Sequence, residues 1–279
     1  MRGSISAPAS PRPDAPDAPD APDTPDAPDA PDAPGAPGEA LFPYAPPVPD
    51  AAAEEAPLSP RYHSAREALL LLLVCFGLHL LVSASTGWGG VARDLAPALQ
   101  VLVWIVPAYW LLQHRGEDPW IRHGLTSSMR GLLPALGLSL GILVAFVAVC
   151  AALSEGPPRP VDWSYLLRFL PEQLVFVALK EEYFFRGVLQ PALEREEGPA
   201  RRILGAPLGR GAIAAAALFA LAHLDPFQGI ELSRLLTFFP ALWFAWLRAR
   251  TGSIVPAILG HTAANVVGQG CLQAFDVGF

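Results

Sequence analysis

The sequence has 279 residues, of which 52% are hydrophobic and only 16% are charged, a composition that excludes an ordinary soluble domain and is typical of a membrane protein. The formal net charge of -7 does not point to a basic partner, because many acidic residues lie in the N-terminal part of the chain. We find no basic aromatic patch, so nucleic acid is not an expected partner. The bias towards Ala, Pro and Arg is typical of a GC-rich genome and points to a bacterium. Together with the apolar composition, it predicts a multi-pass protein of the bacterial inner membrane.

Residues 1–60 form the first predicted segment. They repeat a Pro-Asp-Ala triplet from Pro13 to Gly38 and remain rich in proline to about Pro60. Frequent proline removes backbone donors and favours extended polyproline II, while the regularly spaced aspartates repel one another. We therefore expect a disordered, acidic, cytoplasmic tail that serves as a solvated spacer, with a specific docking motif as the less favoured alternative.

Seven apolar segments follow, and they predict an all-α fold, a polytopic membrane bundle of about seven transmembrane helices. Each segment is compared with a hydrocarbon core of roughly 30 Å, which a helix of about 20 residues can cross. The fifth segment is short and the fourth is long. The segments lie near residues 67–85, 96–113, 131–153, 165–193, 211–224, 231–248 and 254–273.

The placement of arginine predicts the orientation of these segments. Arginines gather before the first segment and after the second, fourth and sixth, whereas the alternate loops hold only Arg93, Arg159 and Arg234. Basic loops stay in the cytoplasm, so we expect a cytoplasmic N-terminus and an exterior C-terminus. The chain then divides into the tail (1–60), three N-terminal transmembrane helices (61–160) and a four-helix core (161–279).

The fourth segment contains VALKEEYFFRGVL, residues 177–189, with four ionisable groups in two helical turns. A charged side chain at the middle of a bilayer costs roughly 2.5–3.5 kcal/mol, so these groups must be paired, hydrated or functional. Glu182 and Arg186 are spaced i, i+4 and can form a charge-assisted pair. Glu181 points about 100° away, which leaves one carboxylate available for chemistry. In the alternative interpretation all four charges, including Lys180, form a buried network that only locks helices together.

Two other segments carry histidine beside a second distinctive residue. The fifth ends in LFALAHLD, which places Phe219 and His223 on one helical face. The seventh contains LGHTAANVV, which places His261 and Asn265 on one face. His79 stands alone, and we expect it to be a satisfied interhelical hydrogen-bond donor. His223, His261 and Asn265 lie on apolar helices like the two glutamates, and one shared polar cavity would explain all of these polar side chains.

A glutamate with two histidines allows two kinds of chemistry. Glu181, His223 and His261 could ligate zinc and leave a fourth position for water. Alternatively, the glutamate could act as general base on a water held by histidine, while other polar groups stabilise an oxyanion. There is no H-E-x-x-H helix, so the familiar zinc-protease motif is absent from the sequence. The cysteines suggest neither a zinc knuckle nor a disulfide framework, and we expect small core residues at Cys75, Cys150 and Cys271.

The polar motifs resemble those of a known family. EEYFFRG, FALAH and HTAAN match, in order and spacing, the E-E-x-x-x-R, F-x-x-x-H and H-x-x-x-N/B motifs of the CPBP proteins. This is the CAAX prenyl endopeptidase and bacteriocin-processing family, also called the Abi family, of intramembrane proteases. The resemblance covers roughly residues 165 to 270. It is specific for the family and does not identify the substrate.

The resemblance implies a role for each matched residue. Glu181 would be the general base that activates water, and His223 would help to hold this water. His261 and Asn265 would stabilise the oxyanion of the tetrahedral intermediate, and the i, i+4 pair of the fourth segment would brace the helix. Family members have been described both as metalloproteases and as metal-independent glutamate proteases. The single unpaired carboxylate favours the second description, in which no cofactor is needed and zinc is the alternative.

The resemblance thus implies an endopeptidase of the cell membrane that acts on a membrane-associated peptide or protein. In a bacterium this would be the maturation of a bacteriocin, a pheromone or a C-terminal sorting tail. Two other classes stay open: a noncatalytic immunity or scaffold protein of the same fold, and an ion-coupled transporter. Complete motifs favour the enzyme over the scaffold, and the lack of an evident inverted repeat counts against the transporter.

One expectation concerns the depth of the histidines in the membrane. The predicted topology puts Glu181 and His261 between the midplane and the cytoplasmic side, but puts His223 near the outer end of the short fifth segment. Either that segment starts earlier, near Ile203, or its helix is tilted or sunk.

Overall fold

The computed structural model describes residues 64–113, 123–125, 131–196, 200–224 and 230–276. All of these lie in the second of two compact units, residues 57–279, and the account that follows concerns that unit. The predicted disordered tail, residues 1–60, lies outside the described residues.

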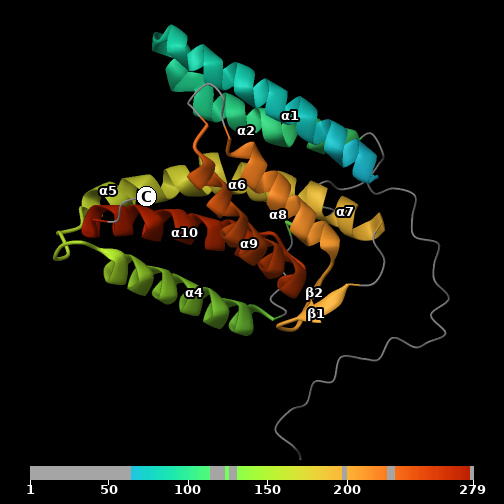
Figure 1. Cartoon of the computed structure of the whole chain (residues 1–279). Helices are drawn as coiled ribbons and strands as arrows, with labels where there is room; N and C mark the ends of the chain where they lie inside the picture. The colour runs from blue at the N-terminus through green and yellow to red at the C-terminus, as the bar shows by residue number, and fades with distance from the viewer. Residues whose placement is uncertain (1–63, 114–122, 126–130, 197–199, 225–229, 277–279) are drawn as a thin grey trace, which may run out of the picture. The chain divides into compact units, whose positions relative to one another are not determined.

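The described residues are almost entirely helical, which confirms the mostly helical fold (Figure 1). Each of the seven apolar segments contains helix. In chain order the elements are α1 (Ala65–Ser85), the 3-10 turn η1 (Thr86–Trp88), α2 (Gly90–Gln113), α4 (Leu132–Leu153), α5 (Trp163–Glu172), η2 (Gln173–Ala178), α6 (Leu179–Glu182), η3 (Tyr183–Leu189), α7 (Gln190–Glu196), β1 (Arg201–Ile203), β2 (Ala206–Leu208), α8 (Arg210–Ala222), the 3-10 segment η4 (Leu232–Thr237), α9 (Phe238–Thr251) and α10 (Val255–Ala274).

Three helices, α1, α2 and α4, are long and apolar enough to cross a membrane. Helix α1 begins with a capping box, in which the Ser64 hydroxyl accepts from the Glu67 N–H and the Glu67 carboxylate accepts from the Ser64 N–H. Helix α4 keeps most of its apolar side chains on the outside, as a helix facing lipid would. These three helices correspond to the first three predicted spans.

The fourth segment forms one unbroken helical run from α5 to α7, about 50 Å long at the rise of an α-helix. At its start the Asp162 carboxyl accepts hydrogen bonds from the Ser164 hydroxyl and the Tyr165 N–H, and these lower its pKa. Two π-helical segments, η2 and η3, lie within the run on either side of α6. The residue after each segment donates its backbone N–H to the carbonyl oxygen five residues earlier. Such π segments are rare and often lie at functional sites.

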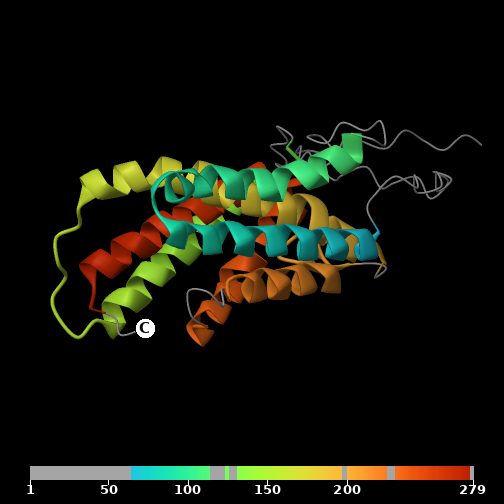
Figure 2. The same cartoon turned by 90° about the horizontal axis from the view of Figure 1, so that it is seen from above.

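Packing around this run brings distant segments together. Helix α10 contacts α4, α5, η2 and α9, while α8 lies against α7 and α9 (Figures 1 and 2). Helices α1 and α2 pack on each other, and both contact η3. On α2, the ring centroid of Trp104 lies 4.9 Å from Phe184 and 5.6 Å from Phe185. Every residue of η3 is buried, so this segment is the centre of the core.

A short antiparallel hairpin, β1 and β2, corrects the expectation of a purely α-helical chain. Its turn is formed by Leu204 and Gly205, which have φ values of 47° and 78°, as a two-residue hairpin turn requires. The side chain of Arg250 donates to the Gly205 carbonyl oxygen at 3.1 Å, and the Trp246 indole donates to the Ile203 carbonyl oxygen at 3.0 Å. The sequence patterns did not predict this hairpin, because its strands have only three residues each and depend on contacts with α9.

The hairpin also bears on where the helix of the fifth segment starts. Because residues near Ile203 are in a strand, the helix does not start there, and that option was wrong. Helix α8 starts at Arg210 and rises only about 20 Å in its 13 residues. This short rise brings His223, immediately after the helix, level with Glu181 on the long helical run.

We expect Gly187→Ala to destabilise the protein, because an added Cβ would lie 2.8 Å from the carbonyl oxygen of His123. Overpacking of this kind costs about 1–3 kcal/mol. Gly268→Ala on α10 is the matched control, since nothing lies within 4 Å of its added Cβ. Thermal unfolding in detergent should place the Gly187 variant below wild type and the Gly268 variant at or above it. Equal midpoints for the two variants would contradict the close packing at Gly187.

Candidate active site

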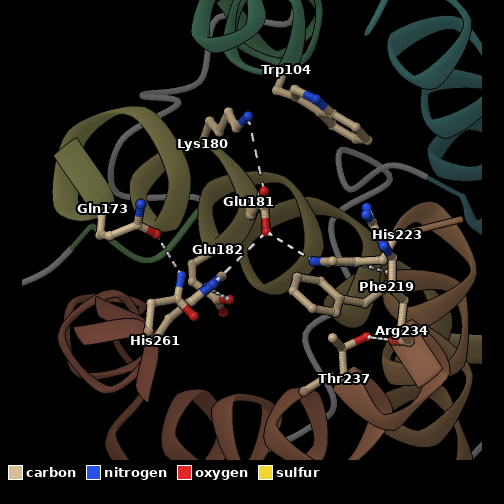
Figure 3. Close-up of polar contacts among 12 residues, drawn as sticks. Trp104, Gln173, Lys180, Glu181, Glu182, Phe219, His223, Arg234, Thr237 and His261 are labelled. Atoms are coloured by element: carbon tan, nitrogen blue, oxygen red, sulfur yellow. Dashed lines mark hydrogen bonds and ion pairs between the residues drawn. The ribbon is translucent and has the colours of Figure 1, made fainter. Parts of the chain in front are cut away.

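Glu181 lies on α6 at the wall of a small polar cavity (Figure 3). Its side chain is 16% exposed, and the cavity has a volume of about 140 Å³. This space exceeds the roughly 30 Å³ that one water occupies in the liquid. The cavity is lined by His79, Trp104, Glu181, Phe185, Ala222, His223 and Arg234.

Two histidines converge on one oxygen of Glu181. Its Oε2 atom lies 4.0 Å from His223 Nε2 and 3.9 Å from His261 Nε2 (Figure 3). Both distances exceed the roughly 2.7–3.2 Å of a direct hydrogen bond. Polar atoms at such a separation can be joined by one water molecule. The structure therefore brings together three residues that lie on three separate helical segments of the sequence.

Hydrogen bonds on the far side of each ring assign the tautomers. His223 Nδ1 lies 2.8 Å from the carbonyl oxygen of Phe219, which can only accept, so Nδ1 carries a proton. His261 Nδ1 lies 2.9 Å from Glu182 Oε1, and the same argument applies to this carboxylate. In the neutral form, each histidine therefore turns an unprotonated Nε2 towards Glu181.

Glu182 is buried and contacts both Arg186, its predicted partner, and His261. Its Oε2 lies 3.3 Å from Arg186 Nε, which places the predicted i, i+4 partners together, and both side chains are fully buried. Arg186 also donates to the Ala241 carbonyl oxygen at 3.0 Å and lies over the Phe219 ring at 5.1 Å. The sequence did not reveal that Glu182 also holds His261, so it has two partners.

Asn265 lies one turn beyond His261 on α10, but its partner was not predicted. The Asn265 amide donates to Gln173 Oε1 at 2.8 Å. Gln173 opens the first π segment and is 8% exposed. The available signal was weak: a single amide within an apolar run, eight residues before Glu181. The two amides form a second polar link between α10 and the long helical run.

A polar chain also approaches Glu181 from the N-terminal helices. Lys180 Nζ lies 3.9 Å from Glu181 Oε1 and donates to Gln100 Oε1 on α2 at 3.3 Å. Gln100 in turn donates from Nε2 to the Ser83 hydroxyl on α1 at 3.3 Å. Helices α1 and α2 therefore both contribute to the surroundings of Glu181, which the sequence motifs did not indicate.

His79 is more involved than the sequence suggested. The Trp104 indole donates to His79 Nδ1 at 3.4 Å, so His79 forms an interhelical hydrogen bond in which this nitrogen is the acceptor. His79 also lines the cavity of Glu181. The cysteines agree with the expectation, since Cys75, Cys150 and Cys271 are all buried.

The donor set was also tested as a metal site. Among the described residues, no three His, Cys, Asp or Glu side chains are grouped as metal ligands would be. Zinc stays the alternative, and chelation tests it.

Comparison with known proteins identifies one family. Residues 142–267 match the family described as Rce1-like, type II CAAX prenyl endopeptidase. No curated protein and no solved structure matches the chain. The matched segment starts within α4 and includes all six predicted site residues, whereas Ser83 and Gln100 lie before it.

Arg186→Ala should lower folded yield and the thermal midpoint, because it leaves Glu182 buried without its cation. Breaking a buried pair in this way costs about 3–5 kcal/mol. The double variant Glu182→Gln with Arg186→Met removes both charges and keeps an acceptor for His261 Nδ1, so it should recover much of the yield. Yield and midpoint are measured after purification in detergent. Wild-type stability of Arg186→Ala would show that the pair does not support the fold.

Proposed function

Residues 142–267 belong to the Rce1-like family of type II CAAX prenyl endopeptidases, and from this membership we propose a membrane endopeptidase with Glu181 as general base. The family consists of membrane proteases, so the substrate is a protein or peptide. The observation that carries the proposal is the convergence of Glu181 Oε2 with His223 Nε2 at 4.0 Å and His261 Nε2 at 3.9 Å.

In the proposed reaction, a water molecule lies between Glu181 and His223. Glu181 takes one proton from it, and the water oxygen attacks the carbonyl carbon of the scissile peptide bond. Neutral His223 accepts a hydrogen bond from the remaining O–H at Nε2, because its Nδ1–H is held by the Phe219 carbonyl. When the C–N bond breaks, the proton on Glu181 passes to the leaving amine, and the carboxylate is restored.

His261 and Asn265 are the proposed donors to the oxyanion of the tetrahedral intermediate. The Asn265 amide has two N–H bonds; one is directed to Gln173, and the other would serve the substrate. For His261 to donate from Nε2, its ring must carry a proton on both nitrogens. The Glu182 carboxylate, 2.9 Å from Nδ1, would balance that positive charge and fix the ring.

The finer features of topology and substrate are part of the same proposal. We propose seven segments within the bacterial inner membrane, with a cytoplasmic N-terminus and a four-helix catalytic core (161–279) beside three N-terminal helices (61–160). The substrate would be a membrane-associated peptide or protein cut near the membrane, such as a bacteriocin, pheromone or C-terminal sorting tail. The three long apolar helices and the cavity between the two groups of helices support this arrangement.

Glu181→Gln should lower turnover by roughly 10²–10⁴-fold, because the amide keeps the shape but cannot take the proton. Purified protein in proteoliposomes would be incubated with membrane-anchored reporter peptides and a membrane extract, and released peptides would be measured by mass spectrometry. Glu172→Gln, an exposed glutamate on the same helical run, is the matched control and should retain full turnover.

Two outcomes would revise this mechanism. Peptide release that survives Glu181→Gln would exclude Glu181 as the base. Release that a strong chelator abolishes and zinc restores would move Glu181, His223 and His261 from acid-base roles to ligand roles.

Asn265→Ala should lower turnover by roughly 10²–10³-fold, the usual cost of one lost oxyanion donor. Gln173→Ala removes the partner of Asn265 but keeps the proposed donor, so we expect a much smaller loss. Both variants are measured for peptide release and for thermal midpoint. Equal losses in the two variants, with equal drops in midpoint, would show that the amide pair is structural and not part of the oxyanion site.

A further inference from the structure

A second and larger cavity, of about 850 Å³, lies between α4, the hairpin β1–β2, α8 and α9. Its volume is within the roughly 300–1,000 Å³ of small-molecule sites. None of the residues assigned to the reaction lines it, so it is separate from the cavity of Glu181. Helix α9 contributes to its wall, and the hairpin lies beside that helix (Figure 1).

The walls of this cavity are apolar and are fixed to one another. Trp243 of α9 donates from its indole to the Ser139 hydroxyl of α4 at 3.2 Å. Trp246, one turn on, donates to the Ile203 carbonyl oxygen of β1 at 3.0 Å. Because both indole N–H groups are used by the walls, these rings have no donor left for an occupant. The interior therefore favours a hydrocarbon chain.

The rim of the cavity is cationic. Arg201 at the start of the hairpin and Arg210 at the start of α8 both line the cavity and are both exposed. Neither side chain forms a hydrogen bond or ion pair with another residue that the structure describes. A guanidinium matches the geometry of a phosphate and can bind it with two parallel hydrogen bonds. Two arginines above an apolar chamber therefore complement an anionic head on an apolar tail.

The surroundings indicate that the occupant comes from the bilayer. Helix α4, which forms one wall, is long and apolar enough to cross a membrane and leaves Leu136 54% and Leu140 64% exposed. The hairpin leaves Ile203 49% and Leu204 70% exposed beside its arginines. Apolar side chains next to basic ones are typical of a surface at the membrane interface.

We propose that this cavity binds one anionic phospholipid, with its phosphate on Arg201 and Arg210 and an acyl chain between α4 and α9. Basic pockets between membrane helices are a common way of holding anionic headgroups. The site also bears on the catalytic residues, because α9 carries Phe244, whose ring stacks on His261 at 4.8 Å with an interplanar angle of 12°. A bound lipid would thus support the helix that holds the His261 ring.

The test compares an anionic and a zwitterionic phospholipid that carry the same acyl chains and differ in the headgroup. Delipidated protein in neutral detergent would receive phosphatidylglycerol, phosphatidylcholine with the same acyl chains, or inorganic phosphate. Bound lipid would be counted by native mass spectrometry, and the thermal midpoint would be recorded. We expect one phosphatidylglycerol per chain and a raised midpoint, little effect of phosphatidylcholine, and none of phosphate. Each arginine near an anionic headgroup contributes about fivefold in affinity, so Arg201→Gln with Arg210→Gln should weaken binding about 30-fold.

The matched control is Arg202→Gln, which removes the neighbouring exposed arginine of β1 that does not line the cavity. It should bind phosphatidylglycerol like wild type. Ile213→Trp would fill the chamber from an exposed position on α8 and should prevent binding with both rim arginines in place. The proposal is overturned if both lipids bind equally, if Arg202→Gln weakens binding as much as the double arginine variant does, or if phosphate alone gives the full rise in midpoint. These readouts do not depend on peptide cleavage.

Discussion

The rest of the site depends on the two contacts of the Glu182 carboxylate, one an ion pair and the other a hydrogen bond. One oxygen meets Arg186 on the same helical run, and the other accepts from His261 on α10. Arg186 continues the connection to the backbone of α9 through the Ala241 carbonyl. A buried carboxylate is costly unless it is paired and hydrogen-bonded, and here the pairing joins three helices. The ring of His261 is therefore fixed by the same contacts that hold the core together.

Two adjacent glutamates serve different purposes because neighbouring residues of a helix point about 100° apart. With η2 and η3 on either side, α6 is a short α-helical piece in which Glu182 points into the core and Glu181 points to the cavity. The fully buried side chain of Glu182 fixes the backbone of α6, so the partly exposed Glu181 needs few contacts of its own to hold its position. What support it has comes from Lys180 and Gln100. Gln100 lies on α2, outside the segment that matches the CAAX endopeptidase family, so this N-terminal helix is part of the site's environment.

Sequence reasoning reached the features that are encoded locally. Apolar runs predicted the helical segments, and the i, i+4 spacing predicted the contact between Glu182 and Arg186. The motifs contain His223 and His261, which lie 4.0 and 3.9 Å from Glu181, but they did not predict these distances. The pairing of Gln173 with Asn265 could not be predicted, because 92 residues separate two amides whose meeting depends on how α10 packs. The hairpin was missed for the same reason, since its short strands depend on contacts with Trp246 and Arg250.

Lys180 has a consequence for solution work on this protein. It is the only lysine of the chain, and it is 4% exposed where α6 meets α2. An amine-selective reagent can therefore reach a lysine side chain only when these helices separate or the protein unfolds. The rate of covalent labelling at this single position therefore measures how often α6 and α2 separate beside the catalytic cavity. It can be read by peptide mapping without an engineered probe.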